Sequence, residues 1–117
     1  MRFFKSFKYA GRGLKYTFLS ERNFKIETGV AILALLAAFY FHISRLELIM
    51  VVLLIALVLL MEIINTAFEY LTDLLKPRLH SYVYTIKDLM SGAVLLISAT
   101  SVIIGLLVFY PYIIKMF

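Results

Sequence analysis

Four polar side chains at the end of a long apolar run are the residues of this chain best suited to chemistry. The stretch MEIINTAFEYLTD, which follows LELIMVVLLIALVLL, carries Glu62, Asn65, Glu69 and Asp73. Spacings of three, four and four residues place these groups within about 80° of arc on one face of a helix. Ionisable groups inside a membrane are costly and are functional candidates by default. Carboxylates also bind magnesium, usually together with substrate phosphates.

The expected depth of this polar face changes along the helix. Glu62 lies about 24 Å along the helix from Leu46. The hydrocarbon core of a bilayer is about 30 Å thick, so Glu62 is still within the apolar zone, near its cytoplasmic boundary. Glu69 and Asp73 lie about 10 Å and 16 Å further along. We therefore expect the face to run from the apolar zone at Glu62 to water at Asp73. A ligand bound along it could have one end in the membrane and the other in water.

Two further pairs of charged residues could join this face. Glu21 and Glu27 lie in SERNFKIE, ahead of the first apolar segment, and Lys87 and Asp88 begin KDLMSGAV, at the start of the last one. A helix N-terminus disfavours a cation, so Lys87 is unexpected there unless it serves topology, lipid headgroups or a ligand. Asp88 could contact a ligand or could simply cap the helix.

A purely structural role is the alternative for polar side chains between packed helices. Asn65 and Thr66 suit hydrogen bonds to a neighbouring helix, which would specify an oligomer. Three carboxylates on one face are harder to explain in this way, because they repel one another unless a cation or basic groups compensate. The pattern therefore favours a binding or catalytic site.

The composition predicts an all-α integral membrane protein with a single domain, residues 1–117. Hydrophobic residues make up 63% of the chain, its mean hydropathy is +0.96, and charged residues make up 16%, against roughly 25% in soluble proteins. The chain has no cysteine, which excludes a disulfide framework and a thiolate nucleophile. In so apolar a chain, the net charge of +5 fits an anionic membrane surface or substrate, and we expect no nucleic-acid partner.

Three apolar segments are long enough to span a membrane. We predict transmembrane helices at about 24–44, 46–75 and 88–114, with Pro77 between the second and the third. Residues 1–20 instead combine phenylalanines with lysines and arginines at helical spacing, which is typical of an amphipathic helix on the membrane surface. Because these first residues are charged throughout, we expect no cleavable signal.

Basic residues are distributed unevenly around these segments. Ten of them precede the first apolar run, which starts at Gly29, or lie between the second and third segments, and two lie on the other side, at Arg45 and Lys115. The positive-inside rule therefore places the N-terminus and the polar end of the second segment in the cytoplasm.

The polar stretch and its flanks resemble the small prokaryotic diacylglycerol kinase family, which includes the undecaprenol kinases. The signature Glu-x-x-Asn-[Thr/Ser]-Ala-x-Glu-x-x-x-Asp stands here as EIINTAFEYLTD, residues 62–73. KDLMSGAVLL is similar to the second motif of the family, and ERNFKIE to the start of its first span. The resemblance extends along almost the whole chain, and KPRLHSYVY departs from it most.

This resemblance implies a multi-pass protein of the bacterial inner membrane that phosphorylates a lipid alcohol with ATP and Mg²⁺. It also implies a homotrimer with its sites, on the cytoplasmic side, between protomers. By motif, Glu62 resembles the general base and Asn65 a catalytic-site asparagine. The metal-bridging carboxylates of the family match Glu21 and Glu69. Positions that align with nucleotide-contacting residues are Lys87, Asp88, Arg2, Tyr9 and His80. Asp73 could support the nucleotide side or simply end the polar face in solvent.

Two other classes of protein stay open at this point. A small proton-coupled transporter would also use buried carboxylates, but its site would usually lie near the bilayer midplane. A non-catalytic assembly protein would explain small-residue faces but not the aligned polar groups. The sequence has no Walker loop and no HRD or DFG motif, so a kinase here would depend on positioning and charge neutralisation. Diacylglycerol and undecaprenol both present a primary hydroxyl, and the residues leave both open.

Overall fold

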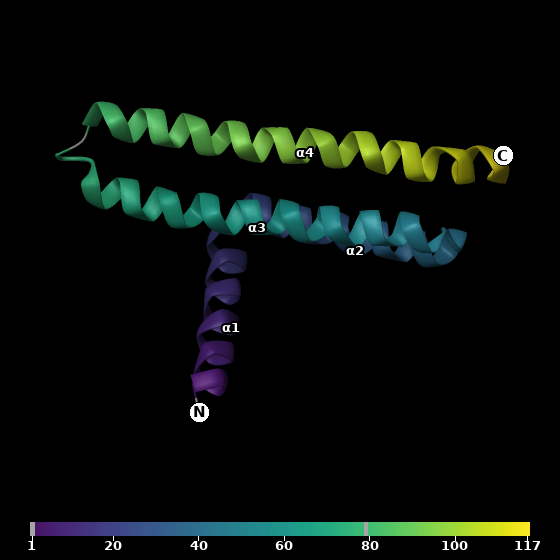
Figure 1. The fold of residues 1–117 in the computed structure, drawn as a ribbon, viewed down its shortest axis with the longest axis horizontal. Helices are drawn as coiled ribbons and strands as arrows, with labels where there is room; N and C mark the ends of the chain where they lie inside the picture. Colours follow the sequence, from purple (N-terminus) through teal and green to yellow (C-terminus); the bar gives the residue numbers. More distant parts are fainter. Residues whose placement is uncertain (1, 79) are drawn as a thin grey trace.

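Four helices account for most of the chain in the computed structural model, which describes residues 2–78 and 80–117. They are α1 (Arg2–Ser20), α2 (Arg22–Phe41), α3 (Arg45–Leu75) and α4 (His80–Met116). α2, α3 and α4 run alongside one another, and α1 lies crosswise to them (Figure 1). By length and composition, α2, α3 and nearly all of α4 could each cross a membrane. The predicted all-helical architecture with three membrane-length helices and an N-terminal helix is confirmed.

α3 is the central element, because it contacts α1, α2 and α4. Figure 1 shows α1 meeting the long helices partway along α3, so that the end of α3 and the start of α4 extend beyond α1. Toward the α3–α4 turn, Thr72 on α3 and Val83 on α4 are each only 1% exposed. Burial of this kind is expected where two helices pack closely.

α4 begins well before the transmembrane segment expected from residue 88. Its first residue is His80, and the added section is held by packing, since the Val83 side chain is buried. Lys87 and Asp88 therefore lie about two turns inside the helix. The prediction that Asp88 could cap a helix N-terminus is therefore wrong. Lys87 is also too far from the first turn of α4 for the helix dipole to disfavour its positive charge.

Short breaks with distinct backbone conformations connect the first three helices. Glu21 has an extended backbone with φ −108° and ψ 114°. Its N–H still donates to the Thr17 carbonyl at 2.9 Å, and its carbonyl accepts from the Lys25 N–H at 3.3 Å. Glu21 therefore belongs to the hydrogen-bond ladders of both α1 and α2. His42 ends α2 in the left-handed region with φ 52°, a common way to terminate a helix.

A capping box starts α3 and is connected to the end of α4. The Glu47 N–H donates to Ser44 Oγ at 3.2 Å, and the Ser44 N–H donates to Glu47 Oε1 at 3.0 Å, which satisfies two otherwise unpaired donors. The Tyr112 hydroxyl also donates to Glu47 Oε1. The Phe41 ring lies 5.9 Å from the Tyr112 ring. These contacts fix α2, α3 and α4 to one another at the end farthest from the α3–α4 turn.

We expect Ser44→Ala to lower the free energy of unfolding by about 1 kcal/mol, because the Glu47 N–H loses its acceptor. Thermal unfolding in detergent micelles would measure the loss. Thr100→Ala is the matched control, since it removes a hydroxyl that donates to the Leu96 carbonyl at 2.8 Å inside α4. That control should change stability by less than about 0.5 kcal/mol. Equal losses in the two variants would contradict the importance of the cap.

Candidate functional site

The polar face predicted on α3 forms a gradient of burial. Glu62 is 2% exposed, Asn65 is partly buried, and Glu69 and Asp73 are exposed. Thr66, beside them, is buried and donates its hydroxyl to the Glu62 carbonyl at 2.9 Å. One helix face therefore carries polar groups from the packed interior of the bundle to its surface.

A polar cleft lies between α3 and α4, with a volume of about 180 Å³. Asn65 Nδ2 donates to Glu69 Oε1 at 3.1 Å, so the amide fixes one carboxylate along α3. Across the cleft, Lys87 Nζ on α4 donates to Asp73 Oδ1 at 3.0 Å. We call this the α3–α4 cleft; its lining residues are Asn65, Phe68, Glu69, Thr72, Asp73, Ile86, Lys87, Met90 and Ser91.

A second cleft, of about 340 Å³, lies between α1 and α3. Glu21 enters it from the break between α1 and α2, and Glu69 enters it from α3. We call this the α1–α3 cleft; its lining residues are Tyr16, Glu21, Thr66, Glu69, Tyr70, Asp73 and Leu74. Glu69 and Asp73 line both clefts, so they form a ridge between them.

The donor set of these clefts suits magnesium only if further ligands are added. Within residues 2–78 and 80–117, no three His, Cys, Asp or Glu side chains come close enough to hold a metal ion. Glu21 and Glu69 are nevertheless brought to one cleft. Mg²⁺ is commonly held by one or two carboxylates, with phosphate oxygens and water completing the octahedron. The pair fits a magnesium ion that arrives with a phosphate ligand.

α1 is attached at the level of this ridge. The Tyr16 and Tyr70 rings lie 5.8 Å apart, and Thr17 on α1 is buried. The neighbouring Tyr70 hydroxyl raises the pKa of Tyr16 above its usual range, chiefly through a side-chain hydrogen bond. The contact with α3 holds the last turn of α1, and with it Glu21, beside Glu69.

Glu27 is a functional candidate for which the sequence predicted no specific role, only a possible place beside the polar face. Its carboxyl group, on α2, interacts electrostatically with that of Glu62 on α3. In the described part of the chain, buried Oε2 of Glu27 has no hydrogen-bond partner. The signal was present, since Glu27 is the one carboxylate within the transmembrane range of about 24–44 predicted from the sequence, just before its most apolar part.

Glu27 also lies at an apolar groove of about 530 Å³ between α2, α3 and α4. Large aliphatic side chains line most of it, and small residues, including Ala31, Ala34, Ser101 and Gly105, line about a third. The groove follows the long helices as far as Ile113 on α4. The carboxyl pair of Glu27 and Glu62 is therefore placed where a long apolar groove meets the polar face.

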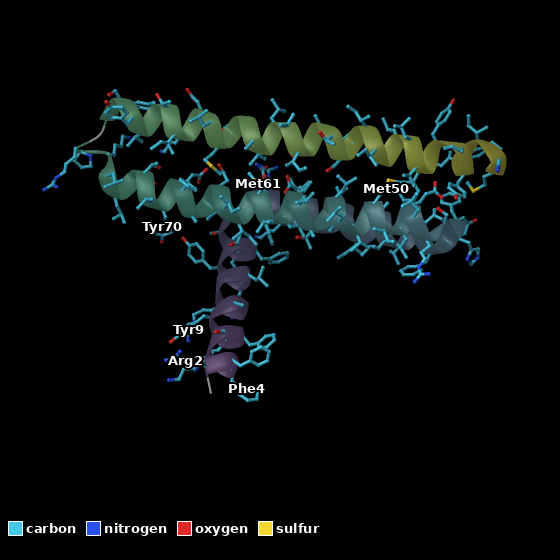
Figure 2. All side chains as sticks on the ribbon, viewed as in Figure 1. Arg2, Phe4, Tyr9, Met50, Met61 and Tyr70 are labelled. Carbon is cyan, nitrogen blue, oxygen red and sulfur yellow. The ribbon has the colours of Figure 1, made fainter. Side chains whose placement is uncertain are left out.

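Three of the predicted nucleotide contacts do not reach these clefts within one chain. Arg2 and Tyr9 lie toward the free end of α1, far from Tyr70 and on the opposite side of α1 from Phe4 (Figure 2). Asp88 is exposed on α4 and lines neither cleft. The side chain of His80 lies outside the described part of the structure. The described chain thus brings together Glu21, Asn65, Glu69, Asp73 and Lys87, with Glu62 and Glu27 next to them.

Comparison with known proteins gives one family and several relatives. Residues 8–109 match the family model described as prokaryotic diacylglycerol kinase. An undecaprenol kinase from Bacillus subtilis is 40% identical over 94% of this chain and 89% of its own length. A diacylglycerol kinase from Synechocystis is 36% identical over 86% of this chain and 58% of its own. A diacylglycerol kinase from Escherichia coli is 28% identical over 87% and 84%. No solved structure gives a significant match.

We expect Glu27→Gln to raise the midpoint of thermal unfolding. The glutamine amide supplies permanent N–H donors to Glu62, whereas the Glu27 carboxyl group can donate only when it is protonated, a gain on the order of 1 kcal/mol. Glu47→Gln is the matched control in detergent micelles and should lower the midpoint, because Glu47 accepts from Ser44 and Tyr112. A lower midpoint for both variants would show that the Glu27 carboxyl is favourable where it lies.

Proposed function

The chain belongs to the prokaryotic diacylglycerol kinase family and is a lipid kinase, and we propose that it transfers the γ-phosphoryl group of ATP directly to the hydroxyl of a membrane lipid alcohol. One observation carries this proposal. The carboxylate face of α3 runs from buried Glu62, whose neighbour Glu27 lines an apolar groove, to two clefts that contain Lys87 and Glu21. A lipid hydroxyl and a nucleotide could therefore approach each other along a single helix.

Glu62 is the general base of the proposed reaction. The lipid hydroxyl oxygen attacks the γ-phosphorus, the bond from the γ-phosphorus to the bridging oxygen breaks, and ADP leaves with that electron pair. The hydroxyl proton passes to the Glu62 carboxylate. Its burial, at 2% exposure, keeps it away from bulk water and near the groove. Asn65 acts beside it by fixing Glu69 through the 3.1 Å hydrogen bond.

Glu21 and Glu69 are the proposed magnesium ligands. When bound, Mg²⁺ would supply positive charge to the phosphates. The formal charges of Glu69, Asp73 and Lys87 in the α3–α4 cleft sum to −1, which would repel a free triphosphate. The cleft is therefore suited to a nucleotide that carries a divalent cation, with Lys87 adding a further positive group.

A homotrimer with sites between protomers would explain the placement of Arg2 and Tyr9. Both are exposed and lie away from the clefts of their own chain, yet their positions align with nucleotide contacts. In the proposed assembly they reach the nucleotide of a neighbouring protomer, together with Asp88 and His80. Many large apolar side chains on α2, α3 and α4 are exposed in the isolated chain, and lipid or neighbouring protomers would cover them.

The proposed membrane arrangement follows from the helices and the basic residues. α2, α3 and α4 span the bacterial inner membrane, and α1 lies along its cytoplasmic surface as an amphipathic helix, in agreement with its crosswise direction (Figure 1). The N-terminus and the site then face the cytoplasm. The aliphatic part of the lipid would lie along the apolar groove.

The experiment that tests this function is a parallel assay of the purified protein with magnesium-ATP and each lipid. We expect phosphorylated lipid to form and ADP release to depend on added lipid alcohol. Undecaprenol should be preferred over diacylglycerol, because the 40% identical relative is named an undecaprenol kinase. ATP consumption that is independent of either lipid, or no transfer to any lipid alcohol, would overturn the proposal.

The role of Glu62 is tested by Glu62→Gln, which keeps the shape of the side chain but removes its basicity. Turnover should fall by about 10²–10⁴-fold, the usual contribution of a general base, while the oligomer stays intact in size-exclusion chromatography. Glu47→Gln, at the other end of α3, should keep near-normal turnover per folded protein. Near-normal turnover in the Glu62 variant would remove Glu62 from the role of base.

A further inference from the structure

We propose that Asp73 is a positioning residue, which holds the Lys87 ammonium group in the α3–α4 cleft where nucleotide phosphates would bind. The inference rests on the proposed function and assigns a role to the least explained member of the polar face. Its basis is the ion pair between Lys87 Nζ and Asp73 Oδ1 at 3.0 Å, which connects α4 to α3 across 14 positions of sequence.

Stability does not explain this ion pair. The two side chains are 36% and 65% exposed, and exposed ion pairs add little to stability because water screens them and their ordering costs entropy. The helices that they join are already packed together through buried Thr72 and Val83. The main consequence of the pair is therefore the location of the lysine nitrogen.

Lysine needs such a partner if its charge is to act at a fixed point. Its ammonium group is carried on a flexible four-carbon stem and is strongly hydrated. On α4, Lys87 could extend toward solvent, but Asp73 keeps its nitrogen in the cleft that also contains the fixed Asn65–Glu69 pair. The entropy of ordering the side chain is then lost before the nucleotide arrives, which should strengthen nucleotide binding.

The contact with Asp73 leaves the ammonium group able to bind phosphate at the same time. An ammonium group has three N–H donors, and the bond to Asp73 Oδ1 uses one of them. Two donors can face phosphate oxygens without breaking the ion pair. This arrangement differs from competition, in which Asp73 would occupy Lys87 and would have to be displaced by the nucleotide.

Binding of the magnesium complex of AMPPNP to the full-length protein in detergent micelles tests the proposal. Asp73→Ala should raise the Kd on the order of three- to tenfold, the usual effect of freeing one ordered side chain. Asp73→Asn retains an oxygen that can accept a hydrogen bond from Lys87, so its affinity for the nucleotide should fall less. In turnover assays the KM for ATP should rise similarly, with kcat and the KM for lipid nearly unchanged.

A double-mutant cycle separates positioning from a general effect of the carboxylate. In a Lys87→Met background, Asp73→Ala should cause no further loss of affinity, because no ammonium group is left to position. An equal loss in both backgrounds would overturn the proposal, and so would tighter binding by Asp73→Ala, the result expected of competition. Unchanged thermal unfolding midpoints and elution volumes verify that each variant is folded. If Asp73→Ala does not fold, Asp73→Asn replaces it in the cycle.

The outcome is independent of lipid chemistry, because AMPPNP binding is measured without lipid. Failure of the wild-type protein to phosphorylate any lipid alcohol overturns the proposed function alone. Additive effects in the cycle overturn the role of Asp73 alone. Absence of magnesium-AMPPNP binding by the wild-type protein overturns the positioning role, since there would be no bound phosphate to meet.

Discussion

The cost of placing a carboxylate among apolar helices is the constraint on which this structure depends. Burial of Glu62 is unfavourable unless neighbouring groups or a ligand compensate, and α3 carries further acidic residues beyond it. Each neighbouring helix places a group near these carboxylates: α1 ends beside Glu69, α4 supplies Lys87, and α2 supplies Glu27. Glu21, at the end of α1, and Glu27 both add negative charge, and of these contributions only Lys87 adds positive charge, so the deepest part of the site has the greatest need for a proton or a ligand.

The ridge formed by Glu69 and Asp73 organises the rest of the site. Because both residues line two clefts, a ligand that contacts Glu21 on one side and Lys87 on the other must cross them. The Asn65–Glu69 hydrogen bond and the Lys87–Asp73 ion pair each fix one member of the ridge. The polar groups are thus ordered within a single chain, although Arg2 and Tyr9 lie far from them.

The sequence was most informative where local periodicity determines geometry. The face shared by Glu62 and Asp73 follows from spacing along one helix, and membrane-length helices follow from apolar runs. The early start of α4 could not be predicted, because HSYVYTIK has no apolar run and is held by tertiary packing at Val83. The Lys87–Asp73 and Glu27–Glu62 contacts depend on how helices pair, which spacing along one helix does not determine.

The break at Glu21 connects the direction of α1 to the position of a carboxylate. This one residue separates α1 from α2 while sharing in the hydrogen-bond ladders of both, and a residue has only two soft torsions. The same pair of angles therefore sets the tilt of α1 against α2 and the position of the Glu21 carboxylate. If α1 lies on the membrane surface, as proposed, a change in its tilt would also move the Glu21 carboxylate, a proposed metal ligand, so the membrane would take part in the geometry of the site.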